Sequence, residues 1–508
     1  MIKFILDLFK SYDNYFIFVI THFYFLTIGF IYYGIYMLML YPLGIYYDVT
    51  IYQIQINYAL LYIPWIMTPI YAILINIFSC QKILGYLLCI MSVVISGLIT
   101  IENNYIVVVT CIIIIGFQIS FITLIIETKI SKLIMKHSYD NSLIIYKNAL
   151  INIGYIIGGI ITSFLVGDNN YYPLYILIFV VNFILFTLYC YEFICNKKFL
   201  LKNGVSLCDK NIQEGDYFEI QIIYIFVIVF LLITTSLWIG FSKFFVDQDI
   251  VFYVTILLIF ANLLTIYFSN RDFFRIVIFI LLTTISNPDS SKVLEYYYTT
   301  NCSSFNFSFN YYISLICIIG GLSGFFASSI YKMFFKNMKY RYTFFILNIL
   351  TSVNLLEILL TSSMIYNNIY FIMITFLKNL VNILILIMMM SLFLKYGYNG
   401  IESIMYSLLV GYYNMGMMIS EYFGIYLYKS FGILTDNENE CDLDNLNYLI
   451  IIVTILCLLR CIYTYLLPNK KQDEELINVN DTLTIKCDGE FDSYVSEIEL
   501  NDLASYPV

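Results

Sequence analysis

Charged side chains are scarce in this sequence. Of its 508 residues, 12% are Asp, Glu, Lys or Arg and 61% are hydrophobic, and the mean hydropathy is +0.83. A soluble protein carries about twice that share of charge, so the composition excludes an ordinary soluble domain. The formal charge of -9 comes largely from the C-terminal tail, and it points to neither a cationic partner nor nucleic acid.

Residues with catalytic or metal-binding chemistry are also few. The chain has 2 His, and it contains no HExxH pattern, no pair of catalytic acids and no Gly-Lys-Ser phosphate loop. Its 12 Cys are scattered through apolar stretches without the spacing of metal ligands. We therefore expect no cofactor, no metal site and no enzymatic activity, and ATP-driven transport by this chain alone is disfavoured. The lack of a repeated pore-loop or filter motif also disfavours a channel.

Apolar stretches long enough to cross a bilayer, which takes about 20 residues, are abundant. They predict an all-α membrane protein with about 14 transmembrane helices in a 6+2+6 arrangement. The expected spans are residues 15–40, 55–79, 83–100, 105–126, 143–166, 172–195, 220–242, 250–269, 273–298, 311–335, 342–364, 369–394, 402–431 and 447–467. The ninth is interrupted by Asn287-Pro288-Asp289, and such a break is tolerated where the helix lines a protein cavity.

The spans divide the chain into two groups of six and an inserted pair. The expected parts are a cytoplasmic N-terminus (1–14), an N-terminal six-helix bundle (15–195), a central cytoplasmic loop (196–219), an inserted helix pair (220–269), a C-terminal six-helix bundle (270–467) and an acidic, disordered cytoplasmic tail (468–508). Two such bundles joined by a loop are typical of alternating-access transporters, whose substrate site lies near the middle of the membrane.

The distribution of Lys and Arg predicts the orientation in the membrane. Basic residues such as Lys129, Lys132 and Lys136 gather in loops on the side of the two termini. Because basic residues concentrate in cytoplasmic loops, we expect both termini in the cytoplasm. Two glycosylation sequons, at Asn301 and Asn306, fall in a loop expected outside. We expect a multi-pass protein of the plasma membrane, with an internal membrane as the alternative.

Four short stretches follow one another in an order and spacing that a known family shares. The first two are Pro64-Trp65-Ile66-Met67-Thr68-Pro69-Ile70-Tyr71 with Gly85-Tyr86, and Pro288 with Tyr298-Thr299-Thr300-Asn301. The last two are Tyr331, Lys336 and Arg341, and Gly400-Ile401-Glu402-Ser403 with Tyr406-Ser407-Leu408-Leu409 and Asn414. Together they resemble the signatures of the folate–biopterin transporter family, from about the second span to the last.

The resemblance implies a major-facilitator-type two-bundle fold. It also implies transport of a folate, a pterin or a related small organic anion, coupled to protons. The family-motif and gating candidates are Pro64, Trp65, Pro69, Gly85, Pro288, Arg341, Glu402 and Asn414. The chain departs from the family where Thr68 replaces a Lys and Leu87-Leu88 replace an Arg pair. In the family these charges form a cytoplasmic latch, so their loss predicts altered gating.

Ionisable side chains at membrane depth are the candidate substrate and coupling residues, because they are costly in lipid and usually face a cavity or a partner. Lys378, in the twelfth span, suits an anionic substrate, or else it pairs with an acid such as Glu421. Glu421 is itself a candidate proton carrier. His22 can titrate near neutral pH, with a structural hydrogen bond as the equal alternative. Glu127, at the end of the fourth span, replaces a family acid pair or lies among the lipid headgroups.

Three alternative functions compete with folate or pterin transport. The chain carries a different small solute, such as an amino acid, a sugar or a nucleoside, or it is a non-transporting receptor or scaffold with a transporter fold. A membrane-embedded enzyme is the third, and no catalytic cluster supports it. Competition among folate, p-aminobenzoate and biopterin tests the first alternative, and flux that depends on Lys378 tests the second.

Overall fold

The computed structural model is helical, with one isolated β-bridge between Lys339 and Lys471 in the residues that it describes. Those residues are 14–78, 81–100, 104–136, 142–166, 171–195, 216–240, 248–289, 291–299, 307–363, 368–396, 402–433 and 445–472. The sequons at Asn301 and Asn306 and most of the expected central loop and tail lie outside this set.

Long rods built from one to three consecutive helices make up the chain before residue 200. They are α2 (Asn14–His22), η1 (Phe23–Met37) and α3 (Leu38–Tyr46); α4 (Ile51–Leu60), α5 (Ile63–Ile66) and α6 (Thr68–Phe78); and α7 (Gln81–Ile99), α8 (Tyr105–Lys136), α9 (Ser142–Val166) and α10 (Tyr172–Cys195). The second rod is segmented because Pro64 and Pro69 have no backbone N–H to donate and restrict the residue before them.

The rest of the chain continues in the same way. Its helices are α12 (Asp216–Gly240), α13 (Gln248–Ser269), α14 (Arg271–Ile285), α15 (Ser291–Thr299), α16 (Phe309–Ile330) with η3 (Tyr331–Phe335), α17 (Tyr340–Ser363), α18 (Asn368–Lys395), α19 (Glu402–Ser430) and α20 (Leu446–Tyr463) with η4 (Thr464–Leu466). The break between α14 and α15 coincides with Pro288, as the sequence predicts.

Several of these rods are long and apolar enough to cross a bilayer. Among the described residues there are seven: Phe16–Tyr46, Ile51–Ile75, Tyr105–Ser131, Ser142–Leu165, Phe309–Phe335, Ile369–Lys395 and Leu446–Leu466. Shorter apolar helices accompany them at Leu87–Ile99, Tyr172–Ile184, Ile225–Ile239 and Leu257–Ser269. The chain is therefore an all-helical, multi-pass membrane protein.

Two helices extend past their predicted ends. The first rod continues to Tyr46 instead of ending at residue 40, and α8 continues to Lys136 instead of ending at residue 126. The charges of Glu127 and Lys129 made the fourth span look complete, but Glu and Lys are good helix formers and do not end a helix. The extra turns place Glu127 inside the protein.

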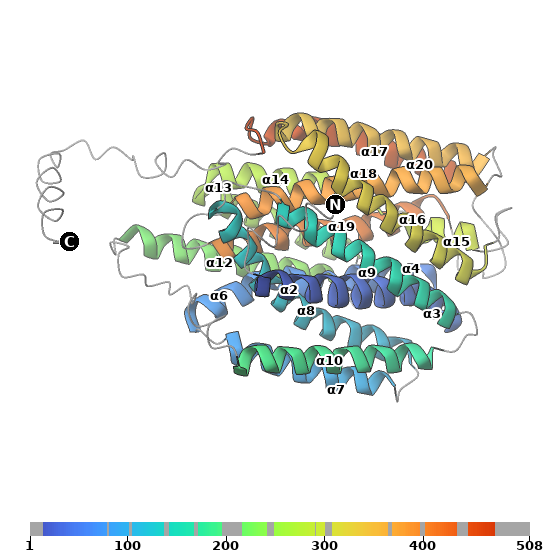
Figure 1. The fold of residues 1–508 in the computed structure, drawn as a ribbon. Helices are drawn as coiled ribbons and strands as arrows, with labels where there is room; N and C mark the ends of the chain where they lie inside the picture. Colours follow the sequence, from blue (N-terminus) through green and yellow to red (C-terminus); the bar gives the residue numbers. More distant parts are fainter. Residues whose placement is uncertain are drawn as a thin grey trace, which may run out of the picture.

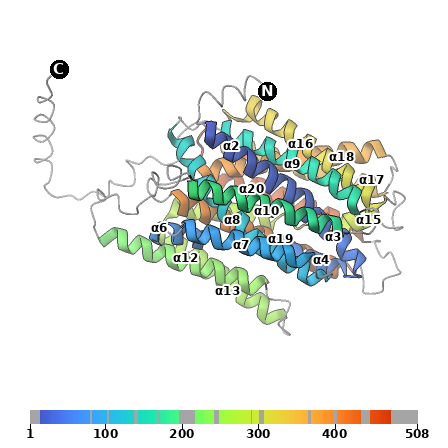
Figure 2. The same ribbon diagram turned by 60° about the horizontal axis from the view of Figure 1, so that its bottom comes forward.

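The helices form a thick bundle with its edge pairs far from the centre (Figure 1). α7 and α10 lie side by side at one edge, and α17 and α20 lie side by side at the opposite edge. Nearer the centre, α9 packs on η1 and on α16, while α4, α5 and α6 all contact α19. α12 and α13 pair with each other along the outside, where α12 contacts α5 and α19 (Figure 2).

The closest helix approach joins η1 to α9 through glycines. A Cβ atom at Gly29 would meet the Ile151 carbonyl oxygen, and one at Gly34 would lie 2.8 Å from the Cα of Gly158. Gly154 and Gly158 are four residues apart in an α-helix, whereas Gly29 and Gly34 are five apart. The wider turn of the π-helical η1 keeps that pair on one face. Lipid gives helices no hydrophobic reason to associate, so such close contact is a main source of helix–helix stability.

The segment after α20 is ordered, which corrects the expected start of the disordered tail at residue 468. Gln472 is fully buried. Its side-chain oxygen accepts a hydrogen bond from the Tyr331 hydroxyl at 2.6 Å, and its amide donates to the Phe335 carbonyl at 3.0 Å. Lys395 donates to its backbone oxygen. These partners hold the segment against η3 and α18.

We expect Gly154→Ala to destabilise the protein by about 1–3 kcal/mol, because the added methyl meets backbone atoms of η1 that cannot move aside. Thermal unfolding of the purified protein in detergent measures the change. Gly97→Ala is the matched control, since its Cβ would lie 3.5 Å from Phe179, an ordinary contact. Equal unfolding temperatures for the two variants would contradict the assignment of this contact.

Candidate functional site

A cavity of about 160 Å³ lies between α15, α16 and α18. Its lining combines the aromatic rings of Tyr298, Tyr312 and Phe371 with the polar side chains of Glu295, Lys378 and Asn379. The cavity adjoins α15, the half-helix that follows the break. Broken helices of this kind line substrate cavities in transporters, because irregular backbone is tolerated only where protein or water surrounds it.

Lys378 supplies positive charge to this cavity from α18. It is partly buried, and the acids that interact with it are Asp289 and Glu295. Glu295 also pairs with Lys292 at 3.1 Å, and the Lys292 ammonium lies 3.8 Å from the centroid of the Tyr58 ring. Lys378 is therefore the ammonium group in the cavity lining that an anion can meet, while Glu295 offers an acceptor for N–H groups.

The aromatic rings of the cavity come from three different helices. The Tyr298 ring on α15 stands nearly perpendicular to Phe371 on α18, with centroids 4.8 Å apart. The centroid of Tyr312 on α16 lies 6.4 Å from that of Tyr298. Edge-to-face packing leaves ring faces on which a flat ligand can stack. A planar heterocycle with an acidic substituent matches this combination of rings, ammonium and carboxylate.

A second polar cluster surrounds the helix break. The side-chain amide of Gln55 on α4 donates to the carbonyl oxygens of Asp289 at 3.0 Å and Glu421 at 3.4 Å. The Tyr428 hydroxyl also donates to the Asp289 carbonyl. The Glu421 carboxyl faces that of Asp289, with which it interacts electrostatically. The expected pairing of Glu421 with Lys378 is therefore not formed between these described side chains.

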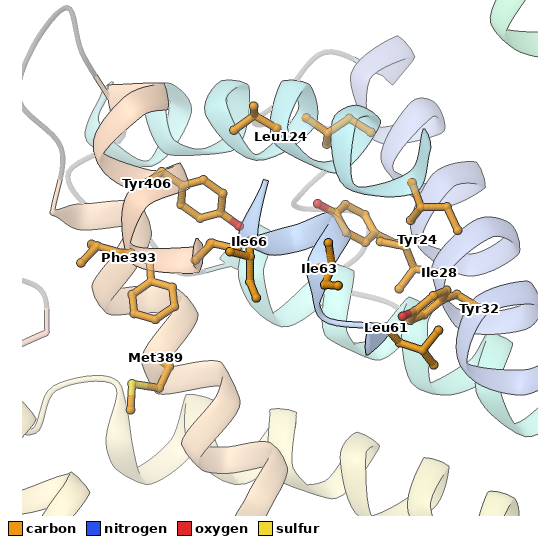
Figure 3. Packing of buried hydrophobic residues seen from close by; sticks show 14 of the residues in the cluster. Tyr24, Ile28, Tyr32, Leu61, Ile63, Ile66, Leu124, Met389, Phe393 and Tyr406 are labelled. Atoms are coloured by element: carbon orange, nitrogen blue, oxygen red, sulfur yellow. The ribbon is translucent and has the colours of Figure 1, made fainter. Parts of the chain in front are cut away.

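A third cluster holds Glu127 at the other end of the bundle. Lys147 on α9 forms an ion pair with its Oε1 oxygen, and the Tyr24 hydroxyl donates to the same oxygen at 2.6 Å. Glu127 is 2% exposed and Lys147 3%. The placement of Glu127 among lipid headgroups is therefore wrong. Tyr24 and Tyr406 point toward each other from η1 and α19, with Ile66 beside them (Figure 3).

His22 makes local contacts. Its Nδ1 lies 3.1 Å from the Phe18 carbonyl oxygen one turn earlier, and its ring is 3.9 Å from that of Phe18. These contacts support the alternative that His22 makes a structural hydrogen bond, because both of them join His22 to a residue of its own helix. The structure does not bring His22 to the cavity of α15, α16 and α18.

The second-helix motif lies between η1, α8 and α19. The Trp65 ring packs on Tyr32, with centroids 4.8 Å apart. A Cβ at Gly116 of α8 would lie 2.9 Å from Pro64, and one at Gly411 of α19 would lie 3.4 Å from Pro69. The two prolines thus segment the rod and also fill close contacts with helices on opposite sides. Pro64, Trp65 and Pro69 therefore contribute to helix packing. None of the three lines the cavity between α15, α16 and α18.

The remaining motif residues are spread over the bundle. Gly85 is buried in α7. The Arg341 side chain donates to the Leu467 carbonyl at 2.5 Å, and the Asn414 amide donates to Val410 of its own helix at 2.7 Å. Pro288 lies in the break itself. Glu402 begins α19, but its side chain is outside the described residues.

Sequence reasoning missed Lys147, Asp289, Lys292 and Glu295. Lys147 lies inside the expected fifth span, so the cost of a charge in lipid was a usable signal. Lys292 and Glu295 lie three residues apart, a spacing at which side chains meet on a helix. They are also inside the expected ninth span, but the break there made the segment look like a loop.

Two solved transporters share this fold. An auto-inhibited POT family peptide transporter superposes with a TM-score of 0.57 and 11% identity, over 89% of this chain and 96% of its own. A point mutant of the nucleoside transporter NupG superposes with a TM-score of 0.55 and 12% identity, over 89% of this chain and 100% of its own. Identities this low show the fold alone. The chain therefore has the same helical fold as these two transporters.

The family follows from the sequence. The BT1 family, that of the folate–biopterin transporters, matches residues 27–484, and the chain belongs to it. No curated protein sequence matches the chain. The resemblance found in the four motif stretches is therefore confirmed.

We expect Glu127→Gln to destabilise the protein by about 3–5 kcal/mol, because it leaves the Lys147 ammonium buried without its counter-charge. The double variant Glu127→Gln/Lys147→Gln should recover part of that loss, because it leaves no unpaired buried charge. Thermal unfolding of the wild type, the two single variants and the double variant measures these differences in stability. Asp272→Asn, which breaks an exposed pair with Arg275, should cost little. A loss no larger than that of Asp272→Asn would contradict the role of the buried pair.

Proposed function

We propose that the protein moves a folate, a pterin or a related small organic anion across a membrane by alternating access, with coupling to protons. The observation that carries the proposal is the cavity between α15, α16 and α18. There an ammonium, a carboxylate and aromatic rings from three helices line one cavity. Such a set recognises a flat, nitrogen-rich ring that carries an acidic group.

The size of the cavity narrows the solute further. Sites for drug-sized ligands measure about 300–1,000 Å³, and this cavity measures about 160 Å³. It accommodates one ring system rather than a whole folate. We propose that the ring binds here and that the charged tail of a folate extends toward Lys378 when the helices separate.

The membrane arrangement is part of the proposal. We propose two six-helix bundles, with α12 and α13 inserted between them as a pair, giving the 6+2+6 order. Both termini face the cytoplasm, Asn301 and Asn306 face outside, and the plasma membrane is the site of action. The basic loops on the side of the termini support this orientation.

Neutral hydrogen bonds replace the charged latch in the proposed cytoplasmic gate. The Thr68 hydroxyl donates to the Trp65 carbonyl of α5 at 2.7 Å and to the Ser407 carbonyl of α19 at 3.3 Å. The Ser131 hydroxyl of α8 donates to the Leu394 carbonyl of α18 at 2.7 Å. These contacts join helices of the first and last groups without ion pairs. We propose that this gate opens with less dependence on salt than a charged latch.

Transport of a different small solute is the main alternative, and a receptor or scaffold is the second. The small cavity favours the first of these over the second, because a receptor needs no enclosed polar space between its helices. An amino acid or a sugar would make poor use of the aromatic lining. Competition by p-aminobenzoate, biopterin and folate against one another tests the ring requirement.

Lys378→Ala should remove most saturable uptake of labelled folate into vesicles that contain the purified protein, because the folate carboxylate loses its counter-charge. Lys378→Arg should retain part of it. Lys332→Ala, at an exposed position on η3, is the control and should match the wild type. Uptake in Lys378→Ala equal to that of the wild type would contradict the assignment of Lys378 to the substrate site. If the folded wild-type protein transports none of folate, biopterin and p-aminobenzoate, the assignment of a folate or pterin substrate is wrong.

A further inference from the structure

The break between α14 and α15 is held by three other helices. Backbone atoms of Asp289 bond to Gln55 of α4 and to Ser420 and Tyr428 of α19. The Asn287 carbonyl accepts from the Ser420 hydroxyl at 2.6 Å, and its side-chain oxygen lies 2.9 Å from the Cys457 sulfur of α20. A Cβ at Gly424 would meet the Asp289 carbonyl, so α19 lies against the break. Any movement of α15 during transport must loosen these contacts.

Buried charges gather around the break. Asp289 interacts with both Glu295 and Glu421, and Lys292 and Lys378 interact with these acids. Arg460 of α20 lies beside Cys457, whose sulfur contacts Asn287 in the break. Among the described residues, no cation forms an ion pair with Glu421. A carboxylate buried without such a pair is costly, a second carboxylate beside it adds repulsion, and one bound proton removes both costs.

Two buried oxygens mark where that proton belongs. The Oε2 atom of Glu421 and the Oε1 atom of Gln55 have no hydrogen-bond partner among the described residues. Gln55 is 0% exposed and Glu421 3%. A protonated Glu421 carboxyl has an O–H to donate, and the acceptors within its cluster are the Asp289 carboxylate and the Gln55 amide oxygen. An ionised one can only accept.

We propose that Glu421 binds one proton and is the coupling site of the transporter. The inference rests on the proposed function and adds to it the position of the proton. The Asp289 carboxylate, which already accepts hydrogen bonds from the backbone N–H and the hydroxyl of Ser291, is the second acid beside it. The other titratable and charged groups near this site are Lys292 and Glu295 of α15, Lys378 of α18, Arg460 of α20, and Tyr62 and Tyr428.

The proton and the solute then act on the same half-helix. Lys378 lines the cavity and interacts with both Asp289 and Glu295, so an anionic solute that engages Lys378 weakens its hold on those acids. The negative charge of Asp289 is then less compensated, which favours a proton on the neighbouring Glu421. With proton and solute bound, α15 stays closed on α4 and α19. When the proton leaves, the carboxylates repel each other and loosen α15 from α19.

The first test needs no solute. Thermal unfolding of the wild-type protein in detergent, measured from pH 5.5 to pH 8, should show stability falling as pH rises, because Glu421 then loses its proton and becomes a buried carboxylate beside Asp289. Glu421→Gln should abolish most of that pH dependence, since the neutral amide stays uncharged at every pH. Asp272→Asn removes one exposed carboxylate from the neighbouring α14 and should leave the wild-type curve unchanged. A Glu421→Gln curve as steep as that of Asp272→Asn would overturn the proposal.

The second test separates coupling from transport itself. Uptake of labelled biopterin is measured in vesicles under an inward proton gradient, and exchange is measured with equal biopterin on both sides and no gradient. In Glu421→Gln the ratio of gradient-driven uptake to exchange should fall toward the ratio that the wild type shows when no proton gradient is applied. A ratio equal to that of the wild type, or uptake driven by a sodium gradient in place of protons, would overturn the coupling site. Absence of exchange in the wild type would instead count against the proposed function, while the stability test still decides the proton site.

Discussion

The interruption of one helix inside the bundle is the constraint on which the polar architecture depends. A broken helix leaves backbone carbonyls and N–H groups without helical partners, and lipid offers none. Here those groups are satisfied by Gln55, Ser420 and Tyr428, which come from helices far apart in the sequence. The same contacts bring Asp289 and Glu421 together. The cavity then forms beside α15, because a half-helix ends where a full helix would fill the space.

Contacts join the early and late helices at both ends of the bundle. At the end that carries α15, the Tyr41 hydroxyl lies 3.2 Å from that of Thr299, and Lys292 lies over the Tyr58 ring. At the other end, Thr68 reaches Ser407 and Ser131 reaches Leu394. Contacts of this kind at both ends are the ones that an alternating-access transporter has to break in turn.

The three buried charge clusters differ in what they can do. Glu127 and Lys147 neutralise each other and Tyr24 adds a hydrogen bond, so that cluster favours a structural role, although Glu127 Oε2 has no hydrogen-bond partner among the described residues. The cluster at the break is incomplete in charge, because no described cation forms an ion pair with Glu421, and the Oε2 of Glu421 and the Oε1 of Gln55 have no hydrogen-bond partner there. Lys378 connects the incomplete cluster to the cavity. An incomplete buried cluster is costly in stability, and such a cost is retained where the charges change during function.

The sequence by itself determined the membrane class, the family and the break at Pro288, because apolar length, motif order and proline chemistry are local properties. It also identified Lys378 and Glu421, since a charge at membrane depth is informative without a structure. Only the tertiary structure decided their partners. Gln55 and Glu421 are 366 residues apart, and Glu127 meets Lys147 through packing of α8 and α9. No pattern along one chain encodes which of several buried acids a lysine meets, because that depends on how the helices are placed by their close glycine contacts and by the backbone bonds at the break.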